Sequence, residues 1–260
     1  MRVKTRQTKL IEIVRRREKV SVDDLAVKLG ASRETIRRDL TQLSEIGKIL
    51  KVHGGARIPR ALGEGTFKQR QSENVDAKVD IAQLAASLFE PGQTLFVDTG
   101  STTLFFIEAI AAASVEGLTL ITNSTENART YAMAKGTGQT FLLGGEFGAK
   151  NSQTVGTMAA AQIRSFRAHH AVLTIGALDA RSGAMDYDIN QAQIAKAMVE
   201  QSEAVTILAD SSKLGALASF EVCPLTSIDR LITEKAPPHD IHQDLETAGI
   251  EVIFPDEKKN

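Results

Sequence analysis

The chain has 260 residues, 42 % of them hydrophobic, with 31 Lys+Arg against 32 Asp+Glu and a net charge of −1. This length suggests about two domains, and the longest apolar runs are far shorter than the ~20 residues that span a bilayer. The single cysteine, Cys223, excludes an intrachain disulfide and a multi-cysteine metal site. Because the first residues also lack the apolar core of a signal peptide, we expect a cytoplasmic protein.

The near-zero net charge hides two parts of opposite sign. Residues 1–60 hold 16 Lys+Arg and 7 Asp+Glu, a net charge of +9, whereas residues 61–260 hold 15 and 25, a net charge of −10. A basic head on an acidic body predicts nucleic-acid binding that is confined to one end of the chain.

The basic head is predicted to contain three helices, over 5–18, 22–29 and 32–46. Ser21-x-x-Asp24 is typical of a helix N-terminus, and Gly30 can reverse the chain because glycine tolerates positive φ. Ser32 is placed to cap the third helix. The apolar residues of that helix recur at spacings of four and three and predict one buried face: Ile36, Leu40 and Leu43.

A strand over 48–52 and a tight turn at 53–55 follow, so the head reads as a winged helix-turn-helix. Arginine can bond guanine in two places and threonine can touch a base edge, while basic residues of the wing would neutralise phosphates. The alternative is that the arginines merely solvate one helix face. The predicted DNA-binding residues are Ser32, Arg33, Thr35, Arg37, Arg38, Lys48, Lys51, His53 and Arg57.

We expect the winged helix-turn-helix to span 1–57, a linker 58–79, and a second domain 80–260. From residue 80, seven apolar strand-like runs (94–97, 118–121, 140–143, 171–175, 205–209, 228–232 and 250–254) alternate with helical segments. Strands that alternate with helices predict an α/β domain with a mostly parallel sheet covered on both faces. Ligands of such sheets bind beyond the carboxyl ends of the strands.

Several of these predicted strand ends carry glycine and hydroxyl residues. Residues 98–103 (D-T-G-S-T-T) precede a helix, whose first amides could hold a phosphate, and Lys213 could supply a cation. Asp98 would repel a phosphate, so we expect it to accept a hydrogen bond from a ligand hydroxyl. The alternative is that such clusters simply build the turns between strands and helices. No G-x-G-x-x-G opens the first crossover, so no dinucleotide cofactor is expected, and the five histidines lack the spacing of metal ligands.

The stretch S-x-x-T-I-R-R-D-L-x-x-L-x-x-x-G-x-I-x-x-x-H-G-G-A at 32–56 resembles the signature of the DeoR family of bacterial sugar-catabolism repressors. The body resembles that family's sensor domain through D-T-G-S-T-T, T-N-S, G-G, G-A-L-D and A-D-S-S-K, and residues 182–188 resemble its glycerol-phosphate branch. The resemblance implies a Rossmann-like sensor of the ribose-5-phosphate-isomerase-like type. The effector-binding residues that we predict on these grounds are Asp98, Gly100, Ser101, Thr102, Thr103, Asn123, Gly145, Asp186, Asp188 and Lys213.

The combined expectation is a non-enzymatic repressor of a carbohydrate or polyol catabolic operon, released from operator DNA by a phosphorylated or sulfonated sugar or by glycerol phosphate. We expect a homodimer or homotetramer, because one winged helix reads too little sequence for useful specificity. An activator would use the same residues. The alternative from another class is a sugar-phosphate isomerase or transferase that carries a basic head, although no carboxylate pair is marked as catalytic.

Overall fold

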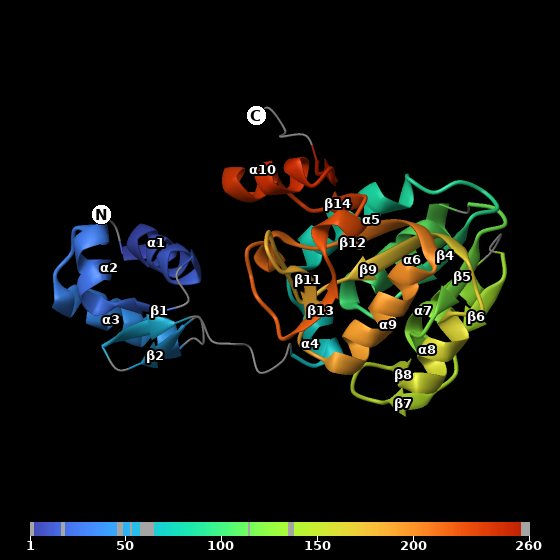
Figure 1. Cartoon of the computed structure of the whole chain (residues 1–260), viewed down its shortest axis with the longest axis horizontal. Coiled ribbons are helices and arrows are strands. Elements are labelled where there is room, and N and C mark those ends of the chain that lie inside the picture. The colour runs from blue at the N-terminus through green and yellow to red at the C-terminus, as the bar shows by residue number, and fades with distance from the viewer. Residues whose placement is uncertain are drawn as a thin grey trace. The chain divides into compact units, whose positions relative to one another are not determined.

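The protein forms two compact units, Met1–Leu62 and Gly63–Asn260. The computed structural model describes residues 3–16, 19–45, 49–52, 54–57, 65–113, 115–134 and 138–255, and Figure 1 shows the elements of each unit. None of the helices in these ranges is long and apolar enough to cross a membrane.

The first unit is a winged helix-turn-helix, as predicted. Its elements are α1 (Val3–Arg16), β1 (Lys19–Ser21), α2 (Val22–Leu29), α3 (Arg33–Glu45), β2 (Leu50–Val52) and β3 (Gly55–Arg57). The strands form an antiparallel sheet in the order β1-β3-β2. Strand β1 was not predicted, because three residues between two helices carry too short a pattern to recognise.

The helix boundaries of the first unit follow from the predicted caps. The Ser21 hydroxyl accepts a hydrogen bond from the Asp24 amide at 3.0 Å, and the Ser32 hydroxyl accepts one from the Thr35 amide at 3.2 Å. Gly30 has φ 59° and ends α2 in the left-handed region, where glycine carries no steric cost. The buried core takes residues from all three helices and the sheet: Leu10, Val14, Val20, Leu25, Leu29, Ile36, Leu40, Leu43, Ile49 and Ala56.

A partly buried ion pair connects α3 to α1. Arg6 Nε donates to Asp39 Oδ2 at 2.5 Å, and Gln7 Nε2 donates to Asp39 Oδ1 at 3.3 Å. The Asp39 side chain is only 4 % exposed, so its charge depends on this partner, since removing one partner of a buried pair leaves an uncompensated charge. The pair therefore fixes the orientation of α3 within the first unit.

The second unit contains a seven-stranded sheet in the order β15-β14-β12-β9-β4-β5-β6. All six pairings are parallel, so the predicted alternation of strands and helices is confirmed. The strands are β4 (Thr94–Val97), β5 (Thr119–Thr122), β6 (Thr140–Leu142), β9 (Ala168–Thr174), β12 (Ser202–Leu208), β14 (Arg230–Ile232) and β15 (Glu251–Ile253).

Helices cover both faces of this sheet (Figure 1). Leu95 and Val97 of β4 belong to a cluster with the helices α5 to α7, whereas Phe96 belongs to a second cluster with α8 to α10. Alternate side chains of one strand thus serve opposite cores. The helices are α5 (Val75–Ala86), α6 (Ser101–Ala113), α7 (Thr125–Met133), α8 (Thr157–Ile163), α9 (Ile189–Glu200) and α10 (His239–Thr247).

The second unit also contains elements that the sequence did not predict. They are a hairpin of β7 (Glu146–Gly148) and β8 (Gln153–Val155), and an antiparallel sheet of β10 (Ala177–Asp179), β11 (Gly183–Asp186) and β13 (Phe220–Cys223). Two short 3-10 helices, η1 (Ser211–Lys213) and η2 (Leu225–Ser227), follow β12 and β13.

The predicted linker at 58–79 is wrong in its second half. Residues Phe67–Ser72 form helix α4, and α5 begins at Val75. Helix α4 starts with a capping box in which the Thr66 hydroxyl and the Gln69 side chain each bond the other residue's backbone amide. Phe67 is buried, so this polar segment folds onto the second unit instead of joining the units as free chain.

Candidate functional site

The exposed face of α3 carries the predicted DNA-binding arginines. Ile36 and Leu40 are buried, while Arg33, Arg37 and Arg38 are exposed. Ser32 and Thr35 lie at the start of the helix, where their hydroxyl oxygens are 2.9 Å apart. The first two turns of α3 therefore present three guanidinium groups away from the core, and Ser32 and Thr35 add two hydroxyls at the start of the helix.

Two of these arginines have acidic partners within the first unit. Arg33 Nε lies 2.6 Å from Asp23 Oδ1, and Arg38 Nε lies 3.7 Å from Glu34 Oε1. The arginine side chains are 68 % and 79 % exposed, and exposed pairs contribute only about 0–1 kcal/mol. Either guanidinium can therefore exchange its carboxylate for a phosphate or a guanine edge at little cost.

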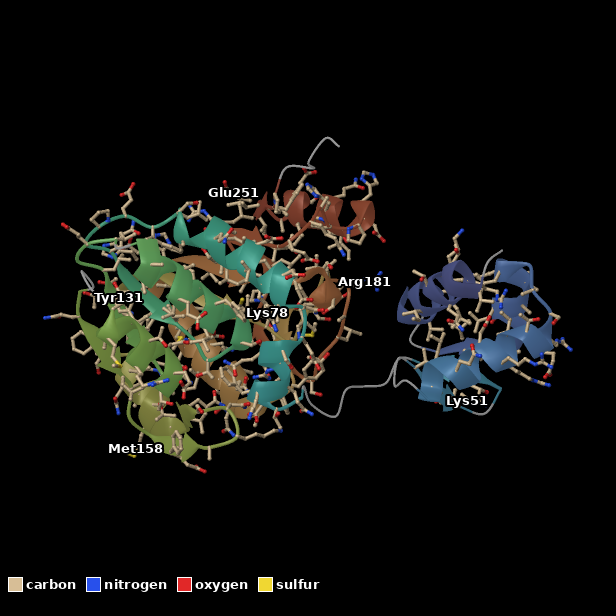
Figure 2. All side chains as sticks on the ribbon, turned by 180° about the vertical axis from the view of Figure 1, so that it is seen from behind. Lys51, Lys78, Tyr131, Met158, Arg181 and Glu251 are labelled. Atoms are coloured by element: carbon tan, nitrogen blue, oxygen red, sulfur yellow. The ribbon has the colours of Figure 1, made fainter. Side chains whose placement is uncertain are left out.

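Lys51 of β2, labelled in Figure 2, hydrogen-bonds α3. Lys51 Nζ donates to Thr41 Oγ1 at 3.0 Å, and Thr41 Oγ1 donates to the Arg37 carbonyl at 2.9 Å. This places a cation beside the same helix that carries the arginines. Of the other predicted wing contacts, Lys48 and His53 lie outside the described residues, and Arg57 lies in β3 with its side chain outside them.

A pocket lies at the carboxyl ends of the central strands β4, β9 and β12. Its walls come from the turn before α6, the ends of β9 and β12, η1, the end of β11, and the α4–α5 segment. It is lined by basic, acidic and neutral polar side chains in one small space. The basic residues are Arg70, Lys78 and Lys213, and the acidic ones are Glu73, Asp186 and Asp210.

The start of α6 forms one wall of the pocket through Gly100, Ser101 and Thr102. The first amides of a helix lack acceptors within the helix, and the helix dipole makes this end positive, so the wall suits an anion. Gly100 is required by close packing. A Cβ atom there would lie 2.1 Å from Thr174 Oγ1 and 2.9 Å from Thr174 Cβ.

Lys78 of α5, labelled in Figure 2, is 4 % exposed. It nevertheless lines the same pocket. Its Nζ donates to the carbonyl oxygen of Arg70 and, at 2.6 Å, to that of Glu73. Burial lowers the pKa of the ammonium, and the nearby Asp210 carboxylate partly opposes that shift. The protein thus keeps a costly buried cation at the pocket, held by backbone carbonyls at the end of α4.

The structure brings five of the ten predicted effector residues to the pocket: Gly100, Ser101, Thr102, Asp186 and Lys213. The prediction that Asp98 faces a ligand does not fit the geometry. Asp98 Oδ2 accepts a hydrogen bond from the Thr174 amide at 3.0 Å, and Asp98 is not among the residues that line the pocket. Burial, opposed by that hydrogen bond and assisted by Asp186, raises the pKa of Asp98 to about 8.

The other four predicted effector residues also lie away from the pocket lining and have structural roles. Thr103 Oγ1 donates to the carbonyls of Asp98 and Gly100, and Asn123 Nδ2 donates to the Thr154 carbonyl. The Asp188 side chain caps α9. Gly145 has φ 149° and packs against the Val155 carbonyl, where a side chain would clash.

Sequence reasoning missed the basic residues Arg70 and Lys78, because the segment was read as a linker. The T-x-x-Q pattern at 66–69 is a capping signal that could have located α4. Thr174, at the end of β9, was also missed, although it lies at a strand end like the predicted residues. Another polar lining residue is Gln191 of α9, for which the sequence carried no separate signal.

Comparison with known proteins agrees with this arrangement. Residues 6–61 match the DeoR-like helix-turn-helix domain, and residues 73–235 match the DeoR C-terminal sensor domain. The chain is 31 % identical over 255 residues to the HTH-type transcriptional repressor CsqR of Escherichia coli (strain K12), which covers 97 % of this chain and 95 % of that protein. It is 30 % identical over 245 residues to the glycerol-3-phosphate regulon repressor of the same organism, over 94 % and 95 % of the two chains.

Among solved structures, ribose 5-phosphate isomerase A from Methanocaldococcus jannaschii is similar to this chain at 17 % identity, with a TM-score of 0.41 over 55 % of each chain. The two domain matches together cover both units, in the same order as in the repressors. The chain belongs to the DeoR family of transcriptional regulators.

Proposed function

We propose that this protein represses a carbohydrate or polyol catabolic operon and that a small phosphorylated or sulfonated sugar, or glycerol phosphate, releases it from operator DNA. The observation that carries the proposal is the pocket at the strand ends. The start of α6 and the cations Lys78 and Lys213 all line it. Charge-assisted hydrogen bonds to an anionic group are the strong ones. Asp186 and Gln191 line the same pocket and supply acceptors and donors for hydroxyl groups.

The names of the relatives support this class of ligand without fixing its identity. One is called a glycerol-3-phosphate regulon repressor, and glycerol 3-phosphate combines a dianionic group with hydroxyls. A sugar phosphate or a sulfonated sugar offers the same two features. For any of them, release of DNA requires that the effector bind the DNA-competent and incompetent states unequally.

We further propose that the protein acts on DNA as at least a dimer, either a homodimer or a homotetramer. A helix-turn-helix unit reads one half-site, and two half-sites give the specificity that a genome demands. Light scattering of the full chain, alone and with operator duplex, measures the oligomer directly. A monomer in both samples would contradict this part of the proposal.

The first experiment screens ligands by melting temperature, because a ligand that binds only the folded state raises it. The panel is glycerol 3-phosphate, ribose 5-phosphate, hexose 6-phosphates and a sulfonated sugar, each beside its uncharged counterpart. We expect a rise with at least one anionic compound and none with its counterpart. Equal effects of both members of every pair would contradict an anion site.

The second experiment separates DNA binding from effector binding. Replacing both Arg37 and Arg38 by Ala removes two exposed guanidinium groups of α3, so we expect loss of the operator footprint and an unchanged melting response to the ligand. A retained footprint would contradict the assignment of α3 as the reading helix. Sustained turnover of a sugar phosphate by the purified protein would instead favour an enzyme.

A further inference from the structure

We propose that Lys78 is the positioning residue that transmits occupancy of the pocket to helix α4. The proposal rests on the proposed function, because it requires an anionic group in the pocket. In the free protein the Lys78 ammonium binds the end of α4; a bound anion draws the same ammonium away from α4 and loosens that helix.

The contacts of Lys78 place it between two partners. The residue is only 4 % exposed, and its ammonium donates to the carbonyl oxygens of Arg70 and Glu73 at the end of α4. The same side chain lines the pocket together with Lys213 and the start of α6. One charged group therefore touches both the ligand space and the helix end.

The contact with α4 is important because α4 lies at the start of the second unit. Helix α4 is the first described element of the second unit, reached directly from the segment that leads out of the first unit. It has only six residues, and a helix this short is not stable by itself in water. Its hold on the second unit therefore depends on tertiary contacts, among them buried Phe67 and the two bonds from Lys78.

An anion competes well for this ammonium because both of its hydrogen-bond acceptors are neutral backbone carbonyls. Hydrogen bonds between two charged groups are stronger than bonds from a cation to a carbonyl, and the attraction grows in the low dielectric of a buried site. Burial lowers the pKa of the ammonium, and the Asp210 and Glu73 carboxylates offset only part of that shift. A phosphate group supplies a further counter-charge and pulls Nζ toward the pocket, which lengthens both bonds to α4.

The experiment measures amide hydrogen exchange of the full chain with inorganic phosphate as the probe, against chloride at equal ionic strength. Phosphate is used at the concentration that saturates its effect on melting temperature. In the wild type we expect the amides of Arg70 and Glu73, which bond within and after α4, to exchange faster by at least about fivefold, the lower end of ordinary coupling factors.

Lys78→Met keeps the length of the side chain and removes its charge. Because Lys78 belongs to the anion site, we expect this variant to need more phosphate for the same rise in melting temperature, with the start of α6 and Lys213 still present. At the phosphate concentration that saturates its own melting response, exchange in α4 should no longer change. Lys78→Gln serves as the second variant if the methionine form does not fold. Lys196→Met makes the same chemical change on the exposed face of α9 and should respond as the wild type does.

The outcomes separate this proposal from the proposed function. If phosphate changes α4 exchange equally in the wild type and in Lys78→Met, or changes melting without changing exchange in the wild type, Lys78 is not the link and the anion site stands. If phosphate changes neither quantity in the wild type, the anion site fails and this proposal fails with it.

Discussion

Gly100 offers the sharpest test of how the pocket wall is built. Replacing Gly100 by Ala adds a Cβ atom 2.1 Å from Thr174 Oγ1, 2.9 Å from Thr174 Cβ and 2.9 Å from Thr174 Cγ2. Rotation of Thr174 about χ1 moves the hydroxyl but leaves its Cβ in place. Because Thr174 ends β9 and that strand is paired on both sides by β4 and β12, the start of α6 must move instead.

The expected cost is that of overpacking, about 1–3 kcal/mol. For a unit of this size, each kcal/mol lowers the melting temperature by roughly 2–4 °C, so we expect a fall of about 2–12 °C. The same displacement moves the first amides of α6 away from the pocket. Binding of phosphate or a sugar phosphate should therefore weaken along with stability.

Urea denaturation at several protein concentrations measures the stability, and Thr174→Ala provides the matched partner variant. Removing Oγ1 and Cγ2 of Thr174 relieves part of the clash, so the double variant should recover about 0.5–3 kcal/mol relative to the sum of the single changes. If Gly100→Ala is as stable as the wild type within about 0.5 kcal/mol, the range of ordinary surface changes, then the close approach is not a constraint and this reasoning fails.

Three further changes test other parts of the structure. Burial raises the pKa of Asp98 to about 8, so the native state keeps a proton that the unfolded state releases near pH 4. The free energy of unfolding should therefore fall as the pH rises from about 5 to 8. Asp98→Asn should flatten that slope in urea denaturation, and an unchanged slope would contradict the raised pKa. Asp23→Asn removes the partner of Arg33 and should tighten operator binding, measured by fluorescence anisotropy, by up to about fivefold. That factor corresponds to about 1 kcal/mol, the most that an exposed ion pair contributes. Weaker binding would show that Asp23 positions Arg33. Lys213→Ala should raise the phosphate concentration that gives half the melting shift, and an unchanged midpoint would remove Lys213 from the anion site.

The sheet and the reading helix could be predicted because their signals are local. Inner strands such as β4 and β5 are buried over most of their length and so read as short apolar runs, and all seven predicted runs became strands of one sheet. Helix α3 was bounded by Ser32, which caps it. Its buried stripe then fixed which arginines face outward.

Half of the predicted effector residues do line the pocket, because the carboxyl ends of parallel strands converge and bring Gly100 and Lys213 together from distant parts of the chain. The sequence could not show that the Asp98 carboxylate would bond the protein backbone instead of lining the pocket. Its orientation is set by the hydrogen bond from the Thr174 amide of the neighbouring strand. Lys78 was missed for a different reason. Helix α4 is polar and short, and tertiary contacts rather than periodicity make it a helix.

Operator affinity with and without effector tests the central claim most directly. Fluorescence anisotropy of a labelled operator duplex gives Kd for the full chain, titrated at fixed salt because affinity for DNA depends on it. With the phosphorylated compound that raises the melting temperature most, we expect Kd to rise about 5–150-fold, and with its uncharged counterpart to stay constant. An unchanged Kd at a saturating concentration of every compound that binds the pocket would contradict the account.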